Sequence, residues 1–349
     1  MLRDLRLRDF RCFNELLFEP SAGLNLIVGQ NAQGKTSLLE AACVLLRLQS
    51  PRSSSLAEAV RFGTPGFGVA GHWNEHHLHV KYTESLKAFA LDSKPQSRSA
   101  DYLMVARVAW MSNDDIQLVR GPGAHRRRYL DFLGAQTIPA YLRSLRAFER
   151  ALRSRNALLK ENRPRREIEA FDKPLIEAGN TLMSARSVMC DELHPLIAAA
   201  LHSISSGSET LKVSYQPGSP PDFSAALRAS RQEECRLRTT VAGPHRDDIA
   251  IQLDGRDAAS FASEGQQRSI ALALKLGQAR RLETFSTGSP LYLIDDIFGE
   301  LDPERRNKFL AALSASAQKF VTATSLNWLE SSRDAALYLL SEGRIFRKR

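Results

Sequence analysis

The stretch that decides the fold is IVGQNAQGKTSLLE, Ile27 to Glu40, which runs from an apolar strand through a glycine-rich turn into a helix. Residues 29–36 match the GxxxxGK[ST] phosphate-loop pattern in full. The glycines let the backbone fold around phosphate, while exposed amides and the helix N-terminus supply positive potential. We expect Lys35 to reach the β- and γ-phosphates of a nucleotide and Thr36 to ligate magnesium. The expected nucleotide contacts are Gly29, Gln30, Asn31, Ala32, Gln33, Gly34, Lys35, Thr36 and Ser37.

A second element, LYLIDD, follows much later in the chain. Residues 291–294 are typical of a strand buried on both faces, and Asp295 comes at its carboxyl end, where α/β sheets bind ligands. We expect Asp295 to hold magnesium and Asp296 to polarise the attacking water, as phosphoryl transfer requires. Two acids after a strand more often mark a turn or a helix cap. Together with the phosphate loop, they indicate a catalytic pair.

Between these elements lies Ser263-Glu264-Gly265-Gln266-Gln267, at the start of a predicted helix. A serine hydroxyl and glycine amides at a helix N-terminus form a second anion site. Because the chain already has one phosphate loop, this second site indicates the nucleotide of a partner. In the segment GELDPERR, we expect the same interface to include Glu300, Leu301 and Asp302.

Strand patterns dominate the start of the chain, and helical patterns replace them from residue 139 to residue 201. Apolar residues there recur at coiled-coil spacing in two runs, separated by KENRPRRE. This pattern predicts an antiparallel helical hairpin with KENRPRRE at its tip, and two helices of an ordinary bundle are the alternative. Strands return afterwards, with a hairpin turn expected at Asp254-Gly255. The predicted fold is therefore α/β, with mixed antiparallel and parallel sheets in a head (1–125 and 205–349) and an inserted helical arm (126–204).

Charge points to a polyanionic partner. Lys and Arg outnumber Asp and Glu by 48 to 39, which favours acidic surfaces or nucleic acid. We interpret the arginines of residues 126–166 as a stripe that contacts a nucleic-acid backbone, and a solvated face is the alternative. No basic strand with interleaved aromatic residues is evident, which favours duplex or junction binding over dedicated single-strand binding. The arginines of the expected stripe are Arg126, Arg127, Arg128, Arg143, Arg146, Arg150, Arg153, Arg155, Arg163, Arg165 and Arg166.

Other sequence features narrow the class of protein. The four cysteines lack metal-site spacing, so we interpret them as reduced packing residues. The start of the chain is too charged for a signal peptide, and no apolar run is long enough to span a bilayer, so a cytoplasmic protein is expected. GPHRDD offers His245, Asp247 and Asp248, but no further ligands at metal spacing. We expect that segment to be a loop packed against the nucleotide lobe.

The order of these motifs resembles the ABC-type ATPase heads of transporter motors and of chromosome-maintenance and DNA-repair ATPases. The resemblance is closer to the RecF family of bacterial recombination mediators, in the segments LRDFRCF, GQNAQGKTSLLEA, GAHRRRYLDF, GPHRDDI, FASEGQQRSIALALKL and DDIFGELDPERR. It implies an ATP-dependent homodimer in which the signature Ser263, Gly265 and Gln266 of one copy face the γ-phosphate held by Lys35 of the other. It also implies a nucleotide contact by Arg11, for which a solvated arginine at the sheet edge is the alternative.

For function, the resemblance implies a clamp on gapped or junction DNA that helps the partners RecR and RecO to load RecA onto single strands. It also implies a DNA-stimulated, magnesium-dependent ATPase. Three departures from the broader ABC pattern predict slow hydrolysis: Asp296 in place of glutamate, Glu264 in place of glycine, and Thr324 in place of a switch histidine.

Two other classes stay open. A transporter motor would need a groove for a membrane partner and normally a switch histidine, which the chain lacks. A nucleotide-switched scaffold that hydrolyses nothing stays possible because of Asp296. Magnesium-dependent release of phosphate would distinguish the scaffold from an ATPase.

Overall fold

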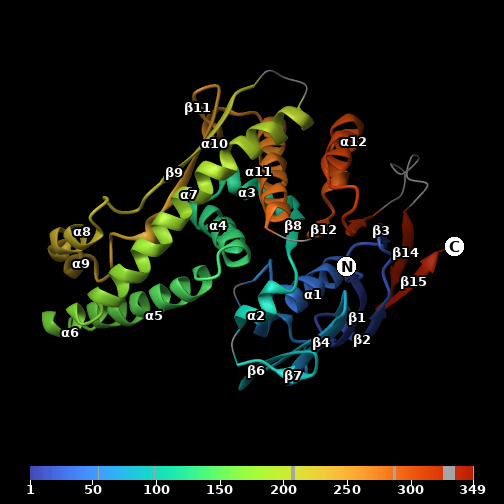
Figure 1. Ribbon diagram of the computed structural model, residues 1–349, viewed down its shortest axis with the longest axis horizontal. Helices are drawn as coiled ribbons and strands as arrows, with labels where there is room; N and C mark the ends of the chain where they lie inside the picture. The colour runs from blue at the N-terminus through green and yellow to red at the C-terminus, as the bar shows by residue number, and fades with distance from the viewer. Residues whose placement is uncertain (54, 98, 206–208, 286–287, 325–334, 349) are drawn as a thin grey trace. The chain divides into compact units, whose positions relative to one another are not determined.

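The computed structural model describes all residues except 54, 98, 206–208, 286–287, 325–334 and 349 (Figure 1). The chain forms two compact units. Unit 1 comprises residues 1–115, 203–205 and 279–349, and unit 2 comprises residues 116–202 and 206–278. Unit 2 thus contains most of the expected helical arm, residues 126–204, together with residues 206–278. The division of the chain into a head and an inserted arm stays a prediction.

Unit 1 contains a six-stranded, mostly parallel sheet in the order β15-β14-β3-β13-β12-β8. Only β15, at the edge, runs antiparallel to its neighbour. The strands in chain order are β3 (Leu24–Val28), β8 (Val108–Ser112), β12 (Leu291–Asp295), β13 (Lys319–Ala323), β14 (Ala336–Ser341) and β15 (Arg344–Lys348). Because the five parallel strands share a direction, their carboxyl ends lie along one edge of the sheet, where the expected site residues fall.

A second, antiparallel sheet in unit 1 has the order β2-β1-β4-β5-β6-β7. Its strands are β1 (Leu2–Phe10), β2 (Phe13–Phe18), β4 (Gly66–Trp73), β5 (His76–Thr83), β6 (Leu86–Leu91) and β7 (Lys94–Pro95). Strands β4 and β5 form an antiparallel hairpin whose turn is Asn74 and Glu75, since His76 and His77 already belong to β5.

Helix α1 (Lys35–Arg47) joins the two sheets of unit 1, since it contacts strands of both. Its residues 38–46 are buried without interruption, as expected for a helix covered on all sides. The remaining elements of unit 1 are η1 (Leu56–Ala59), α2 (Ser99–Met104), η2 (Asn113–Ile116), η4 (Ile297–Glu300) and α12 (Pro303–Ala312), η2 ending in unit 2.

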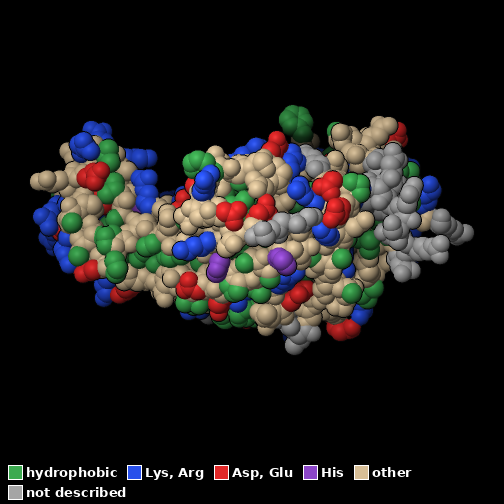
Figure 2. All heavy atoms as spheres, turned by 90° about the horizontal axis from the view of Figure 1, so that it is seen from above, with side chains coloured by type: hydrophobic (Ala, Val, Ile, Leu, Met, Phe, Trp, Pro, Cys, Tyr) green, Lys and Arg blue, Asp and Glu red, His purple; other side chains and the backbone are tan. Residues whose placement is uncertain are grey.

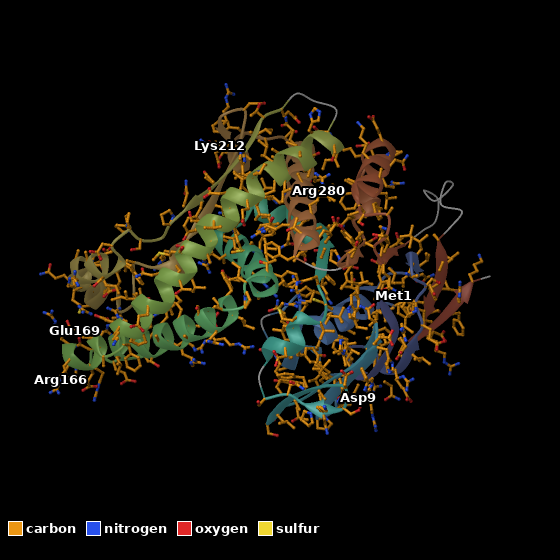
Figure 3. All side chains as sticks on the ribbon, viewed as in Figure 1. Met1, Asp9, Arg166, Glu169, Lys212 and Arg280 are labelled. Atoms are coloured by element: carbon orange, nitrogen blue, oxygen red, sulfur yellow. The ribbon has the colours of Figure 1, made fainter. Side chains whose placement is uncertain are left out.

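Unit 2 carries the predicted helical hairpin. Its long helices are α5 (Tyr141–Lys160) and α7 (Asp172–Ile204), with α6 (Arg165–Glu169) at the tip. Figure 3 shows Arg166 and Glu169 at this end of the unit. Tyr141 bonds Arg186 and Arg155 bonds Asp172, so fourteen residues forward along α5 correspond to fourteen backward along α7. That register confirms an antiparallel hairpin.

The rest of unit 2 is a three-stranded sheet with short helices. The sheet has the order β11-β10-β9, and the Asp254-Gly255 turn has positive φ at both residues, as predicted. Helix α11 ends in unit 1, and so does α7. The elements are α3 (Gln117–Arg120), α4 (Gly123–Thr137), β9 (Leu211–Gln216), α8 (Phe223–Ala229), α9 (Arg231–Leu237), η3 (Pro244–Arg246), β10 (Asp248–Leu253), β11 (Arg256–Asp257), α10 (Ala258–Phe261) and α11 (Glu264–Thr284).

Buried arginine networks fix the helices of unit 2. The Arg155 side chain is fully buried and donates to Glu234 at 2.6 and 3.1 Å, to Asp172 at 3.0 Å and to Thr240 at 2.7 Å. Its membership of the expected surface stripe is therefore wrong. From the sequence alone, Arg155 is expected to face solvent. The acidic residues that pair with it in the structure lie far along the chain, so the sequence pattern does not reveal them.

A second network explains the GPHRDD segment. Asp247 is fully buried and accepts from Arg186, from the Tyr215 hydroxyl at 2.6 Å and from the Gly218 amide at 2.7 Å. Arg186 also donates to Asp131 at 2.7 Å. The segment thus connects α4, α7 and β9 within unit 2, and its packing against the nucleotide lobe stays a prediction.

The cysteines are all free. Cys43 and Cys190 are buried, as predicted, whereas Cys12 and Cys235 are exposed. The packing interpretation therefore holds for two of them.

Candidate nucleotide-binding site

The phosphate loop connects the end of β3 to the start of α1, and two of its glycines are required for different reasons. A Cβ on Gly29 would lie 2.4 Å from the carbonyl oxygen of Leu340 on β14. Gly34 has φ near 100°, and a Cβ there would lie 2.6 Å from the sulfur of Cys12. Any side chain at either position would displace neighbouring atoms or strain the backbone. The loop therefore keeps the narrow shape that the sequence pattern predicts.

Lys35 lies within the loop that it is expected to serve. Its ammonium is buried and donates to the carbonyls of Gly29 at 2.7 Å and Gln30 at 2.9 Å. Burial lowers the pKa of Lys35, and the carboxylates of Asp296 and Asp295 oppose that shift. The positive charge is thus held beside both acids predicted to act with it.

Asp295 joins the two predicted magnesium ligands. The hydroxyl of Thr36 donates to Asp295 Oδ1 at 2.9 Å, and the hydroxyl of Thr322 donates to the same oxygen at 2.8 Å. Burial raises the pKa of Asp295, while these two hydroxyl donors lower it. A hydroxyl and a carboxylate side by side are hard oxygen donors, which suit Mg²⁺ when a nucleotide and water complete its coordination. The residues therefore fit the ion, although in the described part of the chain no group of three or more His, Cys, Asp or Glu residues is arranged for a metal.

Asp296 adopts a left-handed backbone conformation, with φ of 51°. Its amide donates to Thr322 Oγ1 at 2.9 Å, and its carbonyl accepts from Asn113 Nδ2 at 3.0 Å. Burial raises the pKa of Asp296, and the nearby Lys35 lowers it. The conformation is uncommon outside glycine, and the hydrogen bonds on both sides of the residue hold it.

Sequence reasoning missed Thr322 and Asn113. Both lie at the carboxyl ends of the strands that flank β12: Thr322 is the register partner of Asp295 on β13, and Asn113 follows β8. The polar residues that end neighbouring parallel strands were the available signal, but it needs the strand order, which the sequence does not state.

Arg11 belongs to the β1–β2 turn, next to the Cys12 that faces Gly34. Its guanidinium makes two hydrogen bonds with the buried carboxylate of Glu40, at 2.8 and 2.9 Å, and a third with the Glu58 carbonyl. The structure thus fixes Arg11 beside the loop, and its contact with a nucleotide stays a prediction.

The predicted signature lies in unit 2, at the start of α11. Ser263 Oγ accepts from the Gln266 amide at 3.3 Å, and Gln266 Oε1 accepts from the Ser263 amide at 2.8 Å, which is a capping box. Ser263 is exposed, as is Glu264, which pairs with Arg268. Gln266 therefore orients Ser263, and the serine faces solvent as a site for a partner's phosphate requires.

The segment expected beside this interface is partly structural. Leu301 is buried, and Asp302 caps α12 by accepting from the Arg305 amide at 2.9 Å. Thr324, which follows β13, is exposed, and residues 325–334 after it lie outside the described part of the chain.

Part of the expected arginine stripe is exposed on one helix, α5. Four arginines at steps of three and four residues share an exposed face of α5: Arg143, Arg146, Arg150 and Arg153. Figure 2 shows Lys and Arg side chains gathered at the end of unit 2 that carries α6, α8 and α9. Two tip arginines are partly neutralised, since Arg163 pairs with Glu167 and Arg165 with Glu169.

The arginines of α4 differ from one another. Arg126 is largely buried and pairs with Asp248, with one bond of 2.9 Å, and Arg127 donates to the Asp247 carbonyl at 2.8 Å. Only Arg128 of the three is exposed. The contacts of Arg126 and Arg127 within unit 2 are structural, so these two residues differ from the exposed arginines of α5.

No helix in the described residues has both the length and the apolar character that crossing a membrane requires.

Comparison with known proteins places the chain among relatives of one kind. Residues 1–343 match the family model described as RecF/RecN/SMC N terminal domain. The DNA replication and repair protein RecF of Anaeromyxobacter sp. is 35% identical and that of Moorella thermoacetica is 34% identical, covering 99% and 98% of this chain and 98% and 95% of those proteins.

Solved structures agree. The recombination mediator protein RecF-ATP in the RecFOR pathway superposes with a TM-score of 0.89 at 27% identity, covering 100% of this chain and 97% of that one. An Smc head bound to the C-winged helix domain of ScpA, at 14% identity, has a TM-score of 0.57 over 99% of this chain and 97% of that one. The predicted fold class is confirmed.

Proposed function

The chain belongs to the RecF family, and from this premise we propose that it is an ATP-dependent clamp that binds gapped or junction DNA during recombinational repair. The observation that carries the proposal is the meeting of Lys35, Thr36, Asp295 and Asp296 at one sheet edge in unit 1. These residues supply a cation for phosphate, oxygen ligands and a second carboxylate, which is the set that phosphoryl transfer needs.

The residues divide the work of binding and hydrolysis. Lys35 exchanges its two carbonyl acceptors for the β- and γ-phosphate oxygens of ATP, while Thr36 and Asp295 hold Mg²⁺. The ion, when bound, neutralises charge that develops on the phosphates. Asp296 orients a water and accepts its proton, and its short side chain makes hydrolysis weak. Stimulation by DNA belongs to the same proposal.

The clamp is an ATP-dependent homodimer. Ser263 and the Gly265 amide of one copy, with Gln266 orienting the serine, face the γ-phosphate bound by the other copy. RecR, RecO and RecA-type proteins are the proposed partners, and the place of action is the cytoplasm, where chromosomal DNA is repaired. Support comes from the exposed Ser263 and from the RecFOR pathway named for the solved relative.

A scaffold that binds ATP without hydrolysing it is the second candidate, because the Asp296 side chain is one methylene shorter than the glutamate of the broader ABC pattern and so reaches less far toward an attacking water. Release of inorganic phosphate that depends on magnesium decides between the two. Sustained phosphate release supports the ATPase, and its absence in the presence of bound ATP supports the scaffold.

Replacing Asp296 by asparagine tests its role. Because asparagine keeps the shape but cannot accept a proton, we expect ATP binding to persist, hydrolysis to fall by about 100-fold, and the ATP-bound dimer to last longer. Phosphate release and sedimentation velocity with ATP measure the two effects. Asp191→Asn, on the exposed face of α7, is the matched control. Hydrolysis at the wild-type rate in Asp296→Asn would refute the assignment.

DNA binding tests the clamp itself. We expect gapped and blunt duplexes to bind more tightly than single strands of the same length when ATP and magnesium are present, and added salt to weaken binding because phosphate contacts release counterions. Fluorescence anisotropy at two salt concentrations, with and without ATP, measures this. Equal binding with and without nucleotide would contradict an ATP-dependent clamp.

The face of α5 is the proposed duplex contact. Replacing Arg143, Arg150 and Arg153 together by alanine should reduce the slope of log affinity against log salt by about 2 to 3, since each lost phosphate contact removes about 0.9. The control is Arg3→Ala, an exposed arginine that pairs with Glu75 in unit 1. An unchanged slope in the triple variant would place the DNA elsewhere.

A further inference from the structure

The C-terminal hairpin of β14 and β15 exposes an aromatic ring on a well-anchored strand pair. Phe346 is 54% exposed and stands directly opposite Leu339, which is 48% exposed. The other face of the hairpin is fixed to the core: Tyr338 and Leu340 are buried, and the Tyr338 ring lies 5.0 Å from that of Phe18. The exposed pair is therefore a feature of a firmly packed hairpin.

Cations flank this ring. Arg344 and Lys348 lie two residues to either side of Phe346, so they share its face of the strand. Both are exposed, as is Arg347 on the opposite face, and none of the three forms an ion pair within the described chain. Glu342, in the turn, is the only acidic residue between 336 and 348.

Protection of a sheet edge explains only part of this pattern. Edge strands often carry Lys and Arg to prevent pairing with another chain, and β15 is the edge of its sheet. That role does not call for an exposed phenylalanine with a leucine opposite it. A charged groove with an aromatic platform is what sequence-independent binding of single-stranded nucleic acid uses, because every base has a face that can stack.

We propose that the outer face of this hairpin binds single-stranded nucleic acid, with a base stacked on Phe346 and the backbone held by Arg344 and Lys348. The expectation that the chain lacks a basic strand with an interleaved aromatic residue is therefore wrong, since Arg344 to Lys348 has that pattern. The proposal deepens the proposed DNA clamp and rests on it for the identity of the ligand. It adds a contact separate from the duplex contact on α5.

The position of the hairpin connects this surface to the phosphate loop. β14 and β3 are parallel neighbours, so the turn after β14 and the loop after β3 lie at the same edge of the sheet. The Glu342 amide in that turn donates to Gln33 Oε1 at 2.8 Å. The Leu340 carbonyl lies so near Gly29 that a Cβ there would be 2.4 Å from its oxygen. A single strand held on β15 would thus lie beside the loop that binds ATP.

The test uses the full chain and a fluorescein-labelled oligo-dT of about 12 nucleotides, a length within the usual site size. Phe346→Ala should weaken binding by roughly 5- to 150-fold, the range that loss of one stacked base produces. Phe346→Tyr, which keeps the ring, should stay within about twofold of wild type. The matched control is Phe62→Ala, since Phe62 is fully exposed in the same unit.

Two further readouts separate this proposal from the clamp. ATP binding and duplex binding should be unchanged in Phe346→Ala, which shows that the variant is folded and that α5 still works. Equal oligo-dT affinity for Phe346→Ala and wild type would overturn the proposal while leaving the clamp intact. Loss of binding to a repair protein with unchanged oligo-dT affinity would also overturn it, and would make the hairpin a protein contact.

Discussion

Replacing Lys35 by alanine should abolish ATP-induced dimerisation. The Lys35 ammonium is buried in the phosphate loop, where it donates to the carbonyls of Gly29 and Gln30, and the charges of Asp296 and Asp295 favour its protonated form. Without it, the γ-phosphate loses a charged hydrogen-bond donor in a desolvated site, where such a truncation weakens binding by at least about 30-fold. A weakly held γ-phosphate cannot be shared with Ser263 of a second copy.

Sedimentation velocity with and without ATP measures the effect, and isothermal titration measures ATP affinity in the same samples. Lys81→Ala, an exposed lysine of unit 1, is the control and should dimerise as the wild type does. An ATP-dependent shift of equal size in Lys35→Ala and wild type would remove Lys35 from the site.

Replacing Glu234 by alanine should destabilise unit 2 strongly. Glu234 is fully buried and accepts two hydrogen bonds from Arg155, which is itself fully buried. Removing one partner of a buried ion pair leaves a charge without its compensation and typically lowers the free energy of unfolding by about 3–5 kcal/mol. Asp172 still pairs with Arg155, so the lower end of that range is expected.

Urea denaturation followed by circular dichroism measures the loss. Glu233→Ala is the matched control, because Glu233 lies next to Glu234 on α9 but is exposed, and exposed substitutions usually change the unfolding free energy by less than about 0.5 kcal/mol. Equal midpoints for the two variants would show that the Arg155 network contributes little to stability.

The sequence predicted the phosphate loop and the buried strand that ends at Asp295, because the constraints on both are local. The phosphate loop needs Gly29 and Gly34 for contacts and dihedral angles within a few residues of a strand and a helix, and Asp295 ends an apolar strand. The hairpin turn at Asp254-Gly255 is local in the same way. Such patterns can be recognised in the sequence without knowing which strands are neighbours in the sheet.

What the sequence could not show depends on partners far along the chain. Arg155 and Arg126 look like surface cations until Glu234 and Asp248 are placed beside them. Thr322 holds Asp295 only because β13 and β12 pair in one register. Phe346 could have packed toward Phe18 as Tyr338 does, and only the register of β14 and β15 turns it outward.

The buried arginine networks of unit 2 determine how a salt titration of DNA binding can be interpreted. Ions screen exposed charges within about 10 Å at 0.1 M salt, whereas pairs removed from water are screened much less. Arg155 and Arg186 are almost fully buried with their acidic partners, while the arginines along α5 are exposed. Raising the ionic strength should therefore release DNA from α5 while the helix that presents these arginines stays folded, so that the salt dependence counts phosphate contacts and does not report melting of the protein.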